Sequence, residues 1–476
     1  MSGRSGPPET EELAALLAGQ DAWVVGGTVR DELLGRPRVD IDLAIAGDPR
    51  RAARGIARAL GVPAFELSAA FGTWRVAGDG WQVDCSALQG ATIEDDLARR
   101  DLTVNAIAVP LAGGPRVDPH GGVGDLERGV LRMVAARAFA DDPLRTLRVP
   151  RLACELGFSV DEATAAEVRA AAAGLATVAG ERCFAELARI VCGDRAVAGL
   201  RMLDTFGLLA VVLPELHALR GVEQNRYHHL DAFEHTLLVL ERATELERGL
   251  AAAVPGLGDE DAAAIGAQLS EPLGDGLTRF GAVRLAALLH DAGKPQTQAR
   301  AEDGTVLGFP HHAEQGVAIA EAAMRRLRTS ERLRTQVGRL TRHHLGLGFL
   351  VHADPLDDRA IYRYLRATAP VHLDVSVLSI ADRLATGGHK AAVSTERHLA
   401  VAAAVLPRAV RFDAVLAAPP LVRGDALAAA LGLRPGPELG ALLAAIAEER
   451  YAGTVTTAEE AIAFARDRRS RAAAGD

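Results

Sequence analysis

A short strand, a glycine turn and a second strand with two aspartates constrain the fold of this chain more than any other segment. The apolar residues Trp23–Val25 run into Gly26-Gly27 and a helix start, and a second strand follows that carries Asp40 and Asp42. Because side chains alternate along a strand, these two carboxylates point to one face of a sheet and their apolar neighbours to the other. The pattern predicts an α/β domain with a glycine turn beside a pair of acids.

Each part of this pattern has a functional and a structural interpretation. Paired glycines let a phosphate approach the backbone, and Arg30 on the first helical turn would add charge-assisted contacts, but such a turn is also common as simple turn chemistry. Two converging carboxylates suit one or two Mg²⁺ ions, which can activate a hydroxyl and neutralise a triphosphate, whereas the alternative is a solvated strand face. Asp84, on a plausible neighbouring strand, is a third candidate ligand or a solvated strand end.

The rest of the chain is predominantly helical. Its 476 residues exceed the size of one compact core, and after about Arg132 apolar residues recur at the three- and four-residue spacing that is typical of helices. The net charge of −9 excludes a polycation that coats nucleic acid, so any RNA binding must use local patches. Residues 131–151 carry five Arg against two Asp, and residues 321–342 carry seven Arg against two Glu.

The sequence indicates a cytoplasmic protein without membrane association. It contains no charge-free run of about 20 apolar residues that could span a bilayer. Residues 1–19 lack the basic start and apolar stretch of an export signal. The four cysteines stand singly, which is typical of reduced thiols in a cytoplasmic protein.

Histidines and aspartates on four predicted helices form a second set of candidate residues. Eight of the fourteen histidines lie between His228 and His344. A single histidine on a helix is usually a core or surface residue, but His235, His290-Asp291 and Asp382 together offer the imidazole and carboxylate ligands that suit a divalent transition metal.

The first half of the chain resembles the class II tRNA nucleotidyltransferases (CCA-adding enzymes) and bacterial poly(A) polymerases, which belong to the DNA polymerase β-like nucleotidyltransferase superfamily. The glycine turn and the Asp40-Ile41-Asp42 strand are similar to the head motif of that family. Four more blocks follow in the family's order: Arg99–Ala106 with Leu102 for the usual Phe, Asp118–Leu126 with Leu131-Arg132, Asp141–Arg145 with Asp for the leading Glu, and Glu181–Glu186.

This resemblance implies template-independent addition of C and A to the 3′ end of tRNA, from CTP and ATP with Mg²⁺ and with release of pyrophosphate. An A-adding or CC-adding enzyme, or a poly(A) polymerase, is the alternative. Asp40 and Asp42 would be catalytic and hold Mg²⁺. The implied nucleotide-binding residues are Gly26, Gly27, Arg30, Arg100, Asp101, Asn105, Asp142, Arg145, Arg148 and Arg151.

Within these blocks the resemblance assigns ribose discrimination to Arg100, Asp101 and Asn105, and base reading to Asp142 and Arg145. Arg148 and Arg151 would contact phosphate or the tRNA acceptor end. From the residues alone we expect a strand over Thr103–Val109. We also expect Asp141 or Asp142 to be the N-cap of a helix with Pro143 at its first position, which places Asp142 and Arg145 on one helical face. Pro150 should kink or break that helix.

The histidine series resembles the HD phosphohydrolase superfamily. That resemblance implies that His235, His290, Asp291 and Asp382 are metal ligands, with His312 and His343 as additional ligands of a second ion, and that Lys294 contacts phosphate. The metal would be Mg²⁺ or a divalent transition metal, with Ni, Mn, Fe and Zn not distinguished. A phosphatase or 2′,3′-cyclic phosphodiesterase side activity follows, and a chain that is principally an HD phosphohydrolase is a less favoured alternative.

The expected fold class is an α+β head, with a polymerase β-like nucleotidyltransferase sheet and helices, followed by an all-α neck, an HD domain and a tail. The predicted domains are the head at 1–135, the neck at 136–220 for nucleotide-base and RNA binding, the HD domain at 221–395 and the helical tail region at 396–476.

Overall fold

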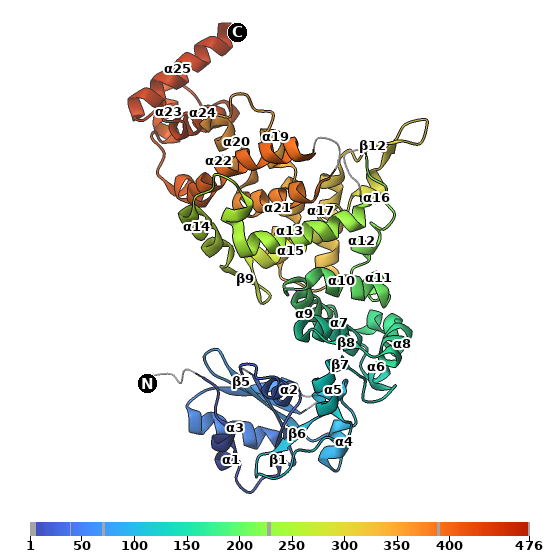
Figure 1. Cartoon of the computed structure of the whole chain (residues 1–476). Helices are drawn as coiled ribbons and strands as arrows, with labels where there is room; N and C mark the ends of the chain where they lie inside the picture. Colours follow the sequence, from blue (N-terminus) through green and yellow to red (C-terminus); the bar gives the residue numbers. More distant parts are fainter. Residues whose placement is uncertain (1–5, 39, 69–71, 226–229, 388–390, 475–476) are drawn as a thin grey trace. The chain divides into compact units, whose positions relative to one another are not determined.

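The computed structural model describes residues 6–38, 40–68, 72–225, 230–387 and 391–474 (Figure 1). The chain forms two compact units, Met1–Val212 and Leu213–Asp476. A mixed sheet with helices lies in the first unit, and the second is mainly helical, which confirms the predicted fold class (Figure 1). Within the described residues, no helix is long and apolar enough to cross a membrane.

A six-stranded sheet with the order β3-β4-β5-β2-β1-β6 organises the first unit. All neighbouring strands are antiparallel except β2 and β5, which are parallel. At the start of β2 the side chains alternate between the two faces of the sheet as predicted, because Ile41 and Leu43 are each only 1% exposed. The strands are β1 (Ala22–Val25), β2 (Asp40–Ile45), β3 (Ala64–Ser68), β4 (Thr73–Ala77), β5 (Gln82–Ala87) and β6 (Ala108–Pro110).

Helix α3 (Pro49–Leu60) covers one face of this sheet, where it packs against β4 and β5. Its buried side, which includes Ile56, faces the strands, and its exposed side carries arginines. The guanidinium groups of Arg50 and Arg54 lie over the Trp74 ring. Because Trp74 and Arg75 are successive residues of β4, Arg75 points to the opposite face, away from α3.

Short helices follow the sheet, and the structure differs from two expectations about this part. Thr103–Val109 is not one strand: a 3₁₀ helix η1 (Thr103–Asn105) precedes β6, because the Thr103 amide bonds to the Arg132 carbonyl and its hydroxyl donates to Asp125. Pro150 lies inside the helix Arg145–Leu156, so the expected break does not occur. The helices are α1 (Thr10–Leu16), α2 (Gly27–Leu33), α4 (Ile93–Leu97), α5 (Gly122–Arg128), α6 (Ala138–Asp141), α7 (Arg145–Leu156), α8 (Glu162–Ala171), η2 (Ala172–Thr177), α9 (Gly180–Val191), α10 (Ala196–Thr205) and α11 (Leu209–Val212), and β7 (Val130–Leu131) pairs with β8 (Ser159–Val160).

The second unit packs around α15 (Arg279–Leu289), every residue of which from Phe280 onward is buried. Helices α13 (Ala232–Ala253), α18 (Glu331–His343) and α21 (His372–Ala385) contact it, and α17 (His312–Arg326) pairs with α18. The other elements are α12 (Pro214–His217), α14 (Asp259–Leu269), α16 (Lys294–Thr297), α19 (Gly346–Leu350), α20 (Asp358–Thr368), α22 (Ala391–Ala417), α23 (Gly424–Leu431), α24 (Pro437–Tyr451) and α25 (Ala458–Ala474), with the hairpins β9 (Pro272–Gly274)–β10 (Leu277–Thr278) and β11 (Ala299–Arg300)–β12 (Val306–Gly308).

Candidate functional sites

The open face of the sheet carries a row of charged side chains across three strands. Asp42 on β2 is in register with Asp84 on β5, and Asp84 is in register with Arg75 on β4. Arg75 donates to both oxygens of Asp84, at 2.8 and 2.7 Å. Asp84 is therefore a neighbour of Asp42, as expected of a third acid, but its carboxylate is already paired with a cation that the sequence did not predict.

The electrostatics of Asp42 suit a bound cation. Burial, followed by the charges of Asp84 and Asp40, raises the pKa of the Asp42 carboxyl, while Arg100 and Arg148 oppose the shift. A divalent ion would relieve this concentration of negative charge, and carboxylate oxygens are ligands that Mg²⁺ prefers. Asp40 and Asp42 therefore fit a Mg²⁺ site.

The glycine turn lies directly beside these acids. Gly26 has φ +70°, a conformation that side chains rarely adopt. A Cβ at this position would lie 2.8 Å from Nη1 of Arg100 and 3.3 Å from Oδ2 of Asp42. The absence of a side chain thus keeps the space between the acid and the arginine open.

A buried polar network joins α2, the helix that follows the glycine turn, to α7. Arg30 donates from Nη1 to Oδ1 of Asn105 at 2.7 Å, and Nδ2 of Asn105 donates to Asp101 at 3.1 Å. Nε of Arg148 then donates to Oδ2 of Asp101 at 2.6 Å. Although burial raises the pKa of Asp101, the charge of Arg148 and the hydrogen bonds from Asn105 and the Leu102 amide hold it well below its usual range.

Arg100 takes a different position from the rest of its block. It pairs with Asp96 at 3.0 Å and points toward Gly26 and Asp42. Arg100 and Asp101 are adjacent in sequence, but their side chains lie in different parts of the site. Arg100 lies beside Asp42, and Asp101 contacts Asn105 and Arg148.

Asp142 lies before α7, not on it, so the predicted helical face is wrong. The N-cap of α7 is Leu144, and Oδ1 of Asp142 accepts the Leu144 amide at 3.2 Å. Arg182 on α9 donates to Oδ2 of Asp142 at 2.9 Å. Arg145 remains close to Asp142 as the first residue of α7, and its Nη1 donates to the Ala138 carbonyl.

One cavity of about 940 Å³ brings most of these residues together. Arg151 is among its lining residues, but it is 4% exposed and pairs with Glu186 at 2.5 Å and Glu155 at 2.7 Å, so its side chain is held within the protein. The lining includes Gly26, Gly27, Arg30, Asp40, Asp42, Arg100, Asp101, Asn105, Asp142, Arg145, Arg148 and Arg182.

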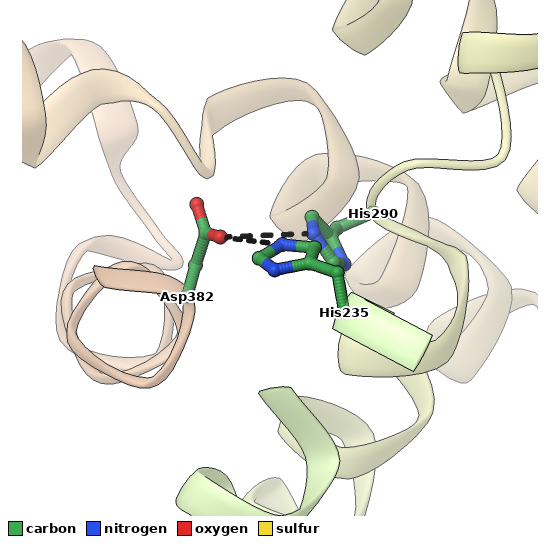
Figure 2. Close-up of side chains that lie close together, drawn as sticks. All are labelled: His235, His290 and Asp382. Atoms are coloured by element: carbon green, nitrogen blue, oxygen red, sulfur yellow. Dashed lines mark ion pairs between the residues drawn. The ribbon is translucent and has the colours of Figure 1, made fainter. Parts of the chain in front are cut away.

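A second centre lies in the second unit, where two histidines and an aspartate from separate segments meet: His235 on α13, His290 directly after α15, and Asp382 on α21 (Figure 2). Nε2 of His235 on α13 lies 3.0 Å from Oδ1 of Asp382 on α21, and Nε2 of His290 lies 4.0 Å from the same oxygen. The ligand atoms of these three residues are all within 4.8 Å of one another. This is the spacing that one divalent ion would need.

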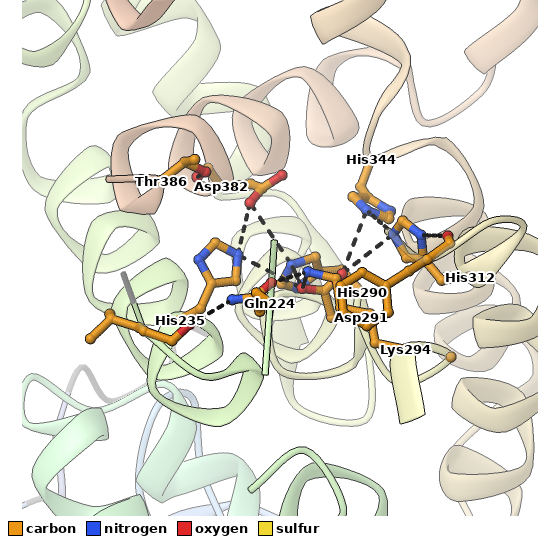
Figure 3. A network of polar contacts seen from close by, with 12 residues as sticks. Gln224, His235, His290, Asp291, Lys294, His312, His344, Asp382 and Thr386 are labelled. Carbon is orange, nitrogen blue, oxygen red and sulfur yellow. Dashed lines mark hydrogen bonds and ion pairs between the residues drawn. The ribbon is translucent and has the colours of Figure 1, made fainter. Parts of the chain in front are cut away.

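Asp291 stands in the middle of the second centre (Figure 3). Its Oδ2 is 3.1 Å from Nε2 of His290, and its Oδ1 is 3.4 Å from Nε2 of His312 and 4.0 Å from Nε2 of His344. His290, Asp291 and His344 form a second group with metal-ligand spacing. We call His235, His290, Asp291, His312, His344 and Asp382 the histidine centre.

The ring orientations of three histidines fit metal binding. Nδ1 of His290, His312 and His344 bonds to the backbone carbonyl three residues earlier, at 2.9, 2.8 and 2.7 Å. A carbonyl can only accept, so Nδ1 carries a proton, and Nε2 is the ring atom turned toward the centre. Burial is the main reason that the pKa of His344 falls to about 3, which keeps this ring neutral as a ligand must be.

The structure corrects the predicted second-ion ligands: His344 enters the centre and His343 does not. His343 ends α18 on its half-exposed side, where burial and the charges of Arg342 and Arg339 lower its pKa. Successive helical residues point about 100° apart, so only one of the pair can face the centre. The buried positions Val337, Leu340 and Thr341 could have indicated this phase from the sequence.

The side chain of Lys294 lies in the histidine centre, where it forms an ion pair and a hydrogen bond with other side chains of the protein. Its Nζ lies 2.6 Å from Oδ2 of Asp291 and donates to Oε1 of Gln224 at 2.6 Å (Figure 3). It also lies over the Phe309 ring. Sequence reasoning missed Gln224, which precedes the first histidine of the series and carries no motif.

Comparison with known protein families gives three matches. Residues 22–132 match the poly A polymerase head domain, residues 157–220 the probable RNA and SrmB-binding site of polymerase A, and residues 232–387 the HD domain. The predicted domain boundaries remain predictions, because these matches cover only part of each segment.

Two similar proteins match over nearly the whole chain. An A-adding tRNA nucleotidyltransferase of Deinococcus radiodurans is 35% identical over 448 residues, which is 93% of this chain and 94% of that protein. A CC-adding tRNA nucleotidyltransferase of Thermus thermophilus is 36% identical over 456 residues, 94% of this chain and 93% of that protein. The solved structure of a CCA-adding enzyme in an apo form is similar in fold, with a TM-score of 0.63, 19% identity, and coverage of 96% of this chain and 92% of that one.

Proposed function

Because this chain belongs to the tRNA nucleotidyltransferase family and carries that family's head domain together with an HD domain, we propose that it adds C and A to the 3′ end of tRNA from CTP and ATP. The observation that carries the proposal is the single cavity that contains both the acids Asp40 and Asp42 and the base-reading candidates Asp142 and Arg145. A nucleotide held by its base at one wall would present its triphosphate to the acids at another.

Asp40 and Asp42 would hold Mg²⁺, which when bound supplies activation of the primer hydroxyl and neutralisation of the triphosphate. Arg100, beside Asp42 and Gly26, is the cation placed to contact phosphate oxygens. Asp101 and Asn105 form the buried wall that would contact the ribose, and the ion pair with Arg148 fixes Asp101 in one orientation.

Base choice is assigned to the pair Asp142 and Arg145, because a carboxylate accepts from an exocyclic amine and a guanidinium donates to a ring nitrogen or carbonyl. This arrangement serves C and A, which both carry an amine at the corresponding edge, and it rejects G and U. In the structure Oδ2 of Asp142 is taken by Arg182, so a base must share or displace that contact.

Separate reactions with CTP and ATP test the proposal. The substrates are tRNAs that end before the first C, after one C and after both. Full CCA addition predicts that CTP extends the first two and that ATP extends the third. Extension by ATP alone would identify an A-adding enzyme, and extension by CTP alone would identify a CC-adding enzyme. Synthesis of long A tracts would identify a poly(A) polymerase. Each of these results would contradict the CCA proposal.

A second activity is favoured by the histidine centre, whose ligand atoms and Nδ1 contacts suit a divalent metal. We propose that it hydrolyses phosphoesters, including 2′,3′-cyclic phosphates, with His235, His290, Asp291 and Asp382 as the ligands. A bound metal would supply an activated water, and Lys294 beside Asp291 would add positive charge near the phosphate. Hydrolysis of a 2′,3′-cyclic nucleotide after loading with Mn²⁺, Ni²⁺ or Mg²⁺, and its loss in His290→Ala, is the expected result. Activity that survives in His290→Ala would exclude the centre.

A further inference from the structure

The open face of the sheet continues beyond the acids to the edge strand β3. Asp42 on β2 is in register with Asp84 on β5, and Asp84 with Arg75 on β4. Arg75 is in turn in register with Phe65 on β3. Residues directly opposite one another in neighbouring strands project from the same face of a sheet. These four side chains therefore form one row, which we call the cross-strand row, and it spans about 14 Å at about 4.8 Å between strands.

The cavity that contains Asp42 extends along this row. Its lining includes Ser86 on β5 and Thr73 on β4, whose hydroxyl groups lie 2.9 Å apart. Each of them is two residues from a member of the cross-strand row on its own strand, and so lies on the same face. Helix α3 covers the opposite face, where it packs against β4 and β5. The space beside the acids thus continues over β5 and β4, on the side of β2 away from the glycine turn.

Phe65 ends the cross-strand row with an aromatic ring that is open to solvent. It is 46% exposed, as is Leu67 two residues further along β3. An aromatic ring next to an arginine is a combination that binds single-stranded nucleic acid, because a base stacks on the ring while the guanidinium contacts a phosphate. Phe65 and Arg75 are cross-strand neighbours, and both lie on the face that carries the acids.

Arg75 keeps a donor that Asp84 does not use. Its Nε and Nη2 donate to the two oxygens of Asp84, and the described residues include no hydrogen-bond acceptor for its Nη1. The planar guanidinium directs Nη1 away from the carboxylate that the other two nitrogens face. Because the side chain is 25% exposed, Nη1 is available to an anion that lies on this face.

The geometry of nucleotide transfer brings the growing strand to this side of the acids. An in-line displacement requires the attacking hydroxyl to lie opposite the leaving pyrophosphate. The glycine turn follows β1, and β1 and β5 are the two neighbours of β2 in the sheet. A triphosphate held at the glycine turn, on the β1 side of Asp42, leaves the β5 side for the hydroxyl. The strand that carries this hydroxyl then extends over β4 and β3.

We propose that Arg75 and Phe65 form a subsite for the 3′ end of the RNA strand that is extended. Nη1 of Arg75 binds the phosphate between the last two nucleotides, and the Phe65 ring stacks on the base of the last but one. The order of the cross-strand row fits such a strand, because its terminal hydroxyl, this phosphate and this base lie at increasing distance from Asp42. The proposal rests on the nucleotide-addition function proposed above.

Steady-state addition of AMP to tRNA that ends in CC tests the Phe65 contact in the full-length protein with Mg²⁺. Phe65→Ala should raise KM for the tRNA at least about fivefold, the lower limit for one base stacked on an aromatic side chain. The kcat should change little, because the stacking is equal in the ground and transition states. Phe65→Trp should keep the wild-type KM. Leu67→Ala is the control, and an unchanged KM in Phe65→Ala, or an equal rise in the control, would overturn the proposal.

A tRNA that lacks only the base of its last-but-one nucleotide identifies the stacking partner. With this abasic substrate the wild type should show the raised KM, and Phe65→Ala should show no further rise, since the contact is already absent. A further rise as large as that on the intact tRNA would contradict stacking on this base.

A methylphosphonate linkage between the last two nucleotides tests the phosphate contact, because it removes the charge of that one phosphate. Arg75→Gln retains a hydrogen-bond donor for Asp84. It should raise KM for the natural tRNA at least about tenfold, as expected for a hydrogen bond to a charged group, and have little effect with the neutral linkage. Equal effects of Arg75→Gln on the two substrates would show that Arg75 acts only through Asp84 and would refute its place in the subsite.

Failure of this proposal and failure of the proposed function give different results. If the protein adds only A or only C, the CCA proposal fails, and the same variants are compared with the nucleotide that it accepts. If it adds neither, fluorescence anisotropy with labelled tRNA that ends in CC measures binding to the wild type, Phe65→Ala and Leu67→Ala. Weaker binding by Phe65→Ala alone would support the subsite, and equal binding by all three proteins would refute it.

Discussion

Arg148 and Asp101 form an ion pair with 2.6 Å between Nε and Oδ2, and this pair joins α7 to the loop that precedes η1. Asp101 is buried, whereas the side chain of Arg148 is 36% exposed toward the cavity. The pair therefore links Asp101, a candidate for ribose contact, to the helix that begins with Arg145. A substitution on either side of the pair should alter the position of the residues on the other side.

Loss of this ion pair should weaken both stability and nucleotide binding. Arg148→Ala leaves the buried Asp101 carboxylate with only its neutral donors, which we expect to cost about 1–3 kcal/mol in the free energy of unfolding. KM for both CTP and ATP should rise. Thermal melts and steady-state kinetics measure the two effects, with Arg137→Ala, an exposed arginine of the same cavity, as the control. An unchanged melting temperature would contradict the structural role.

The same pair predicts a pH dependence of stability. The folded-state pKa of Asp101 is lowered, so its stabilising effect is fully present above the unfolded value of about 3.9 and is lost as pH falls through the lower folded value. Urea unfolding of the wild type and Asp101→Asn should therefore differ most near neutral pH and converge below about pH 4. A difference that grows as pH falls would have the wrong sign.

Gly26→Ala should abolish nucleotide addition because the new Cβ enters the space between Arg100 and Asp42. Gly35 is the matched control, since it also has a positive φ, of +66°, but nothing lies within 4 Å of its Cβ position. Both variants should lose a similar, small amount of stability, of about 1 kcal/mol, from backbone strain. If Gly35→Ala lost as much activity as Gly26→Ala, strain alone would explain the effect.

His344→Ala and His343→Ala form a matched pair for the histidine centre. Removal of His344 takes away a ring whose Nε2 lies 4.0 Å from Asp291, whereas His343 lies outside both groups with metal-ligand spacing among the described residues. Titration calorimetry with Mn²⁺ should show at least about tenfold weaker binding in His344→Ala and no change in His343→Ala. Weaker Mn²⁺ binding in His343→Ala than in His344→Ala would instead support the assignment of His343 as a ligand, which was made from the sequence.

Periodicity accounts for what could be predicted from the sequence and for what could not. The strand period of two is unambiguous, so Asp40 and Asp42 could be placed on one face of the sheet. Long-range partners such as Arg75 and Gln224 depend on strand register and on chain folding, which short motifs do not encode. The choice between His343 and His344 depended on helical phase, and the place of Asp142 depended on where α7 begins.

The position of Arg151 illustrates a further limit. The resemblance assigns Arg151, like Arg148, to contact with phosphate or the tRNA acceptor end, but helices α7 and α9 pack closely enough for Glu186 to pair with the Arg151 side chain and bury it. An ion pair between two helices, such as that of Arg151 with Glu186, follows from tertiary packing and cannot be predicted from helical spacing alone.

The most direct test of the central claim is incorporation of labelled CMP and AMP into tRNA that lacks its CCA end, catalysed by Asp42→Asn. Asp48→Asn is the control, because Asp48 caps α3 away from the acids and asparagine also caps well. The account predicts that Asp42→Asn loses at least about a thousandfold in rate with both nucleotides, the effect of several kcal/mol of lost charge stabilisation, while the control keeps its activity. Near wild-type incorporation by Asp42→Asn would contradict it.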